Sequence, residues 1–111
     1  MQVEKYMRGT VTVVVVDGDL DGVTAAEASA NLEALTPDSG QLLLDLGRVG
    51  YLSSAGLRVL LLLYYRARAH GVPLALAAMP EEARSVLAAT GFLDSVLVAD
   101  SVDDAIRVLA P

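Results

Sequence analysis

Apolar runs alternate with short polar segments along the whole chain, and the lengths of these runs predict alternating strands and helices. The β-branched run at 11–16 is typical of a strand buried on both faces. A turn at Arg8-Gly9-Thr10 separates it from a weaker strand at 2–7, so we expect these two strands to form a hairpin. Further strands are expected at 41–46, 74–78 and 95–99.

Four segments have helical spacing or helix-start signals. Thr24 and Glu27 form a capping-box sequence at the start of a helix expected at 24–35. A second helix at 54–69 is so apolar that we expect neighbouring elements to cover most of it. A third should begin at Pro80-Glu81-Glu82 and end near Gly91, and a fourth should follow Ser101. This order predicts an α/β fold, with a mixed, mostly parallel sheet of about five strands and about four helices, in a single domain over residues 1–111.

The junction between the 41–46 strand and the second helix is the leading candidate for a functional site. Small residues and hydroxyls gather there, at a helix N-terminus whose backbone amides lack intrahelical partners. From the local sequence Ser54 is expected to cap the helix, since a serine hydroxyl can accept a hydrogen bond from a backbone amide of the first turn. The same exposed hydroxyl would suit a modifying kinase. Gly56 is expected where the backbone packs closely.

Charge and composition exclude several function classes. The net charge is −6, which disfavours nucleic acid as a partner. The chain has no cysteine, which is typical of a cytoplasmic protein and excludes a thiolate metal site. Its single histidine excludes a multi-histidine metal site. Asp17, Asp19 and Asp21 lack the distant glutamate of a calcium loop and are interpreted as a solvated turn. No signal-peptide pattern or membrane-length apolar run occurs, so we expect no insertion into a membrane.

No enzyme motif is present. The chain lacks a phosphate-binding loop, a dinucleotide fingerprint and a G-x-S-x-G elbow. His70 lies at the far end of the second helix, roughly 24 Å from Ser54 at about 1.5 Å per residue, so it cannot act as a base for that serine. We therefore expect no catalytic residue, no cofactor and no metal; a small serine hydrolase would lack its base.

Three segments resemble the STAS domain family, and specifically the bacterial anti-sigma factor antagonists. Residues 18–21 (Gly-Asp-Leu-Asp) are similar to the family's turn before the first helix, and residues 83–104 are similar to its C-terminal half. Residues 45–57 are similar to its Asp-Leu-Ser…Phe-x-Asp-Ser-Ser/Thr-Gly-Leu signature. The chain departs from that signature at three positions: Ser53 replaces the usual aspartate, Ala55 a frequent hydroxyl residue, and Gly47 a frequent serine.

The resemblance implies a phosphorylation switch. Such an antagonist binds an anti-sigma factor that is also a serine kinase, and this binding releases the sigma factor. The kinase, which holds the ATP, then phosphorylates the residue matching Ser54 (with Ser53 as the second choice), and a serine phosphatase reverses the modification. The implied partner-binding residues are Asp19, Asp21, Ser53, Ser54, Ala55, Gly56, Leu57 and Arg58. An alternative within the same fold is a constitutive accessory subunit of a membrane transporter complex, docked through the apolar second helix. The sequence leaves homodimer formation open.

Overall fold

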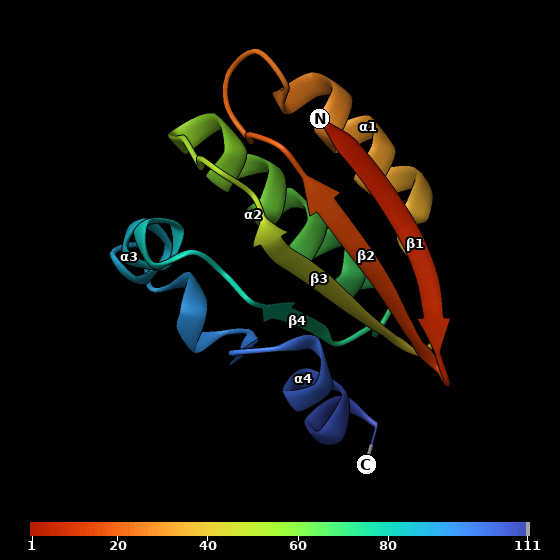
Figure 1. Ribbon diagram of the computed structural model, residues 1–111. Coiled ribbons are helices and arrows are strands. Elements are labelled where there is room, and N and C mark those ends of the chain that lie inside the picture. Colours follow the sequence, from red (N-terminus) through yellow and green to blue (C-terminus); the bar gives the residue numbers. More distant parts are fainter. Residues whose placement is uncertain (111) are drawn as a thin grey trace.

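A five-stranded mixed sheet forms the centre of the molecule in the computed structural model, which describes residues 1–110 (Figure 1). The strands lie in the order of the chain, β1-β2-β3-β4-β5. β1 (Gln2–Arg8) pairs antiparallel with β2 (Val11–Asp17), and β3 (Gln41–Arg48), β4 (Leu74–Ala77) and β5 (Leu97–Ala99) continue in parallel from β2. The predicted hairpin and the predicted fold class are confirmed.

Four helices cover the two faces of the sheet. α1 (Ala25–Leu35), α2 (Ser54–Ala69) and α3 (Glu81–Ala88) contribute to one apolar core, and α4 (Val102–Leu109) contributes to the other (Figure 1). Alternate residues of a strand point to opposite faces, so Leu42 and Leu44 join the first core while Leu43 packs in the second with Ala105 of α4. This two-sided burial explains why the central strands β2, β3 and β4 are mostly apolar.

Some element boundaries differ from those expected from sequence. β4 ends at Ala77 because Ala78 has a left-handed backbone, with a φ of 56°. α3 ends at Ala88, and a 3₁₀ turn, η1 (Phe92–Asp94), occupies the segment before β5, which begins at Leu97 instead of residue 95.

α2 is less covered than its composition predicts. Val59, Leu60 and Leu63 are buried, but Leu62 and Tyr65 point away from the sheet and are 55% and 61% exposed. The expectation that neighbours cover most of this helix is therefore wrong for one stripe of apolar side chains.

Candidate functional site

Two loops that are distant in sequence are joined beside the N-terminus of α2. Leu20, in the loop after β2, forms an isolated parallel bridge with Leu52, in the loop after β3. The Leu20 amide donates to the Tyr51 carbonyl and the Ser53 amide donates to the Leu20 carbonyl, both at 2.9 Å. Because both leucines are buried, the bridge fixes the Asp19–Asp21 turn next to the start of α2, as the predicted site requires.

Ser53, and not Ser54, caps α2. Ser53 has an extended backbone, and its Oγ accepts a hydrogen bond from the Gly56 amide at 3.3 Å. The same hydroxyl donates to the Leu20 carbonyl at 3.4 Å. The expectation that Ser54 caps the helix is therefore wrong by one residue, because the Leu20–Leu52 bridge holds the chain extended through Ser53 and the helix begins only afterwards.

Ser54 is the first residue of α2 and is exposed. Within residues 1–110 its hydroxyl makes no hydrogen bond, and the amides of Ser54 and Ala55 have no backbone partner. Free first-turn amides and the positive end of the helix dipole both favour an anion at this position. The site can therefore present a free hydroxyl and accommodate a negative group attached to it.

Gly56 has a structural role inside the site. A Cβ added at this residue would lie 2.8 Å from Leu20 Cβ and 2.8 Å from Leu52 Cδ1, and closer still to the Leu20 carbonyl oxygen. Only glycine therefore lets α2 approach the loop bridge this closely. Gly56 is buried, so of the predicted partner-binding residues it is the one that a partner cannot reach directly; Ala55 and Leu57 are half-buried and Arg58 is exposed.

The aspartates of the first loop also have distinct roles. Asp21 Oδ1 accepts hydrogen bonds from the amides of Val23 at 2.9 Å and Thr24 at 3.0 Å, so Asp21 caps the turn that leads into α1. Thr24 Oγ1 donates to the Asp19 carbonyl at 2.7 Å and accepts from the Asp21 amide at 3.1 Å. The predicted capping box of Thr24 and Glu27 does not form, because the threonine hydroxyl is occupied in the loop. The Asp19 side chain is exposed.

The described residues place neither a cluster of possible metal ligands nor a histidine beside Ser54. In the described part of the chain, no group of three histidine or acidic residues could hold a metal ion. His70 is the C-cap of α2, at the opposite end of the helix from Ser54. None of the helices in residues 1–110 has both the length and the apolar composition to cross a bilayer.

Sequence reasoning missed a groove next to Ser54. A cavity of about 410 Å³ lies between α1 and the first turns of α2, lined by Ala25, Ala26, Ser29, Ser54, Ala55, Arg58, Val59 and Leu62. The signal in the sequence is the helical spacing of Arg58, Leu62, Tyr65 and Arg66, which places polar and apolar side chains on one stripe.

Comparison with known sequences identifies a family and two relatives. The model of the STAS domain family matches residues 2–105. BtrV of Bordetella bronchiseptica, named as a proposed anti-sigma factor antagonist, is 36% identical over 91 residues, which cover 80% of this chain and 78% of BtrV. Osmosensory protein A of Mycobacterium tuberculosis is 30% identical over 79 residues, or 71% of this chain. The match spans only 50% of that relative's length.

Solved structures share the fold. An anti-sigma factor antagonist from Mycobacterium paratuberculosis superposes with a TM-score of 0.86 at 24% identity, covering 99% of this chain and 94% of the other. The Bacillus cell fate determinant SpoIIAA in its phosphorylated form superposes with a TM-score of 0.71 at 16% identity, covering 96% and 99% of the two chains. At these identities the likeness shows the fold alone.

Proposed function

The chain belongs to the STAS domain family, and on that premise we propose that it is an anti-sigma factor antagonist switched off by phosphorylation of Ser54. The observation that carries the proposal is that two adjacent serines have different hydrogen-bonding environments. Ser53 caps α2, which leaves the Ser54 hydroxyl exposed and free on the first turn of the same helix. BtrV, which is named as a proposed anti-sigma factor antagonist, is similar over 80% of this chain and supports the antagonist part of the proposal.

In the active state the unphosphorylated protein binds an anti-sigma factor that is also a serine kinase, and the sigma factor is released. The docking surface consists of the exposed or half-buried residues around the start of α2. It includes Asp19 and Asp21 of the first loop with Ser53, Ser54, Ala55, Leu57 and Arg58, while Gly56 supports it from below.

Phosphorylation then changes this surface without changing the fold. The Ser54 oxygen attacks the γ-phosphorus of ATP held by the kinase, ADP leaves, and the hydroxyl proton passes to a base of the kinase. The phosphate adds about −1.5 to −2 charges at pH 7. The unpaired amides of Ser54 and Ala55 and the helix dipole stabilise that charge, so the helix persists while the docking surface gains bulk and negative charge. A serine phosphatase reverses the step.

The geometry favours Ser54 over Ser53 as the acceptor. The Ser53 hydroxyl is half-buried and is engaged with Gly56 and Leu20, so a kinase would have to break the helix cap to reach it. Serine and aspartate are both preferred N-caps, which explains why Ser53 can stand where the family usually has aspartate.

The test is to incubate the protein with its anti-sigma factor kinase and ATP and to locate the phosphate by mass spectrometry. We expect one phosphate at Ser54 in the wild type and in Ser53→Ala, and none in Ser54→Ala. Isothermal calorimetry with the same kinase should detect binding of the unphosphorylated protein and its loss after phosphorylation. Phosphate at Ser53 alone, or equal affinity before and after phosphorylation, would refute the switch.

A second candidate is a constitutive accessory subunit of a membrane transporter complex. The exposed Leu62 and Tyr65 on α2 favour it, since a permanently docked subunit can keep apolar side chains covered by its partner. Stable co-purification with a transporter ATPase subunit, unchanged by Ser54→Asp, would support this function over the first.

A further inference from the structure

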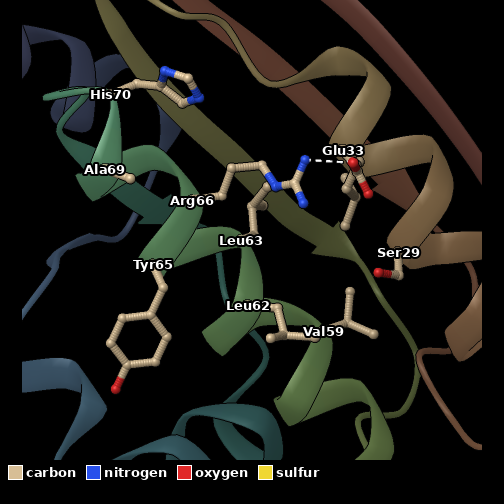
Figure 2. Close-up of a pocket in the computed structure, with 10 residues that line it drawn as sticks. Ser29, Glu33, Val59, Leu62, Leu63, Tyr65, Arg66, Ala69 and His70 are labelled. Carbon is tan, nitrogen blue, oxygen red and sulfur yellow. Dashed lines mark ion pairs between the residues drawn. The ribbon is translucent and has the colours of Figure 1, made fainter.

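A groove runs between α1 and α2 along the length of α2. Its first part, of about 410 Å³, begins at Ser54 and Arg58. Its second part, of about 380 Å³, continues to Arg66 and His70 and shares Ser29, Val59 and Leu62 with the first. Figure 2 shows this second part, with Ser29 and Glu33 on α1 facing Leu62 and Arg66 on α2.

The groove has an apolar floor and an exposed apolar rim. Val59 and Leu63 are 5% and 4% exposed and form the floor, while Leu62 and Tyr65 stand on the rim and are more than half exposed. The Tyr65 ring packs edge-on against Tyr64 at a centroid distance of 5.4 Å, which holds it in place. A continuous stripe of this kind is typical of a surface that another protein covers.

The charges along α2 indicate what covers it. The chain has a net charge of −6, yet α2 contains Arg58, Arg66 and Arg68 and no acidic residue. Arg66 is paired with Glu33 across the groove. Arg58 makes no ion pair within residues 1–110, so an unpaired cation remains at the Ser54 end of the groove.

A second copy of this chain is a poor occupant. A two-fold symmetric contact would set α2 against α2 and bring their arginines together, and among the described residues that line the groove Glu33 alone is acidic. A segment of a different protein that carries both apolar side chains and carboxylates can cover the apolar stripe and pair with the Arg58 cation.

We infer that the α1–α2 groove binds a segment of the anti-sigma partner in which apolar side chains are flanked by carboxylates, with Leu62 and Tyr65 as apolar contacts and Arg58 as the charge contact. This inference rests on the proposed function and adds a reason why the switch works. Ser54 and Arg58 are four residues apart and lie on one face of α2. A phosphate on Ser54 therefore neutralises Arg58 and repels the acidic segment at the mouth of the groove.

The experiment measures the affinity of the unphosphorylated protein for its anti-sigma factor kinase by isothermal calorimetry. We expect Leu62→Asp and Arg58→Glu each to raise Kd at least about tenfold, and Tyr65→Ser to act in the same direction. The matched control is Val108→Asp, which places the same charge on a 63% exposed valine of α4, on the other side of the sheet, and should leave Kd within about twofold. Circular dichroism verifies that each variant is folded. The wild-type Kd should also rise with salt, and this rise should shrink in Arg58→Glu.

The outcomes separate this inference from the proposed function. If the kinase fails to bind the wild type or fails to phosphorylate it, the proposed function fails. If it does both and the groove variants bind like Val108→Asp, the groove inference is overturned and the function stands. Sedimentation that shows a wild-type dimer dispersed by Leu62→Asp would also overturn the inference, because the occupant would then be a second copy.

Discussion

The Ser53 hydroxyl accepts a hydrogen bond from the Gly56 amide at 3.3 Å, and this contact makes Ser53, not its neighbour Ser54, the cap of α2. Ser53 is tied to the helix and, through the Leu20 carbonyl, to the loop after β2. Ser54, one residue further on, belongs to the helix itself and leaves its hydroxyl in solvent. A helix cap and an exposed, unbonded hydroxyl therefore coexist at adjacent positions in the described part of the chain.

Removing the cap should cost stability, while removing the adjacent hydroxyl should not. Ser53→Ala loses the side-chain acceptor for the Gly56 amide, and we expect the free energy of unfolding to fall by about 1 kcal/mol. Ser54→Ala, the matched control, should change it by less than about 0.5 kcal/mol. Urea denaturation followed by circular dichroism measures both. Equal losses in the two variants would contradict the assignment of the cap to Ser53.

Gly56→Ala should be more damaging than its size suggests. The new methyl group would meet the Leu20 carbonyl and the Leu52 side chain, and the Leu20–Leu52 bridge prevents the loops from moving away. Overpacking of this kind costs about 1–3 kcal/mol. Gly22→Ala is the control, since a Cβ at Gly22 has no heavy atom within 4 Å. Thermal unfolding of both variants compares their stabilities. If Gly56→Ala were as stable as Gly22→Ala, the Leu20–Leu52 bridge would have to shift without cost to make room for the methyl group.

Local patterns were enough to predict the element order, the hairpin and the fold class. β2 and β3 are mostly apolar runs bounded by glycine- and aspartate-containing turns, and such signals act over a few residues. The start of α4 was also predicted from local sequence, since the Ser101 hydroxyl caps this helix by accepting a hydrogen bond from the Asp104 amide at 3.1 Å. Local patterns also marked the junction at Ser54 as the leading candidate site, with Ser54 as its helix cap, and the resemblance to the STAS family added the hypothesis of a phosphorylation switch there.

Features that depend on long-range contacts could not be predicted from sequence. The Leu20–Leu52 bridge joins residues 32 positions apart and decides which serine caps α2. Thr24 stands at the capping position of a capping-box pattern, yet its hydroxyl donates a hydrogen bond to the Asp19 carbonyl in the folded loop. The exposure of Leu62 depends on where α1 packs against α2, which periodicity does not specify. In each case tertiary packing overrides a local preference.

The charge at residue 54 should change stability with a definite sign. An anion near a helix N-terminus interacts favourably with the dipole by about 0.3–1 kcal/mol, and a cation interacts unfavourably. We therefore expect Ser54→Asp to unfold at or slightly above the wild-type Tm and Ser54→Lys to unfold below it, with the difference decreasing at high salt. Scanning calorimetry at low and high salt measures this. A Ser54→Asp protein less stable than Ser54→Lys would show that a phosphate could not be accommodated at this position.

Asp21 should stabilise the first loop through its oxygen atoms and not through its charge. Asp21 Oδ1 accepts hydrogen bonds from the amides of Val23 and Thr24. The turn that it caps leads directly from the Leu20–Leu52 bridge into α1. Asp21→Ala removes that acceptor and should lower the free energy of unfolding by about 1 kcal/mol, with faster hydrogen exchange at both amides. Asp21→Asn retains a carbonyl oxygen in the same place and should keep most of the stability, because asparagine and aspartate cap equally well. Urea denaturation and amide exchange by NMR measure the pair. If Asp21→Asn were as unstable as Asp21→Ala, the charge of this aspartate, and not its capping geometry, would hold the loop beside Ser54.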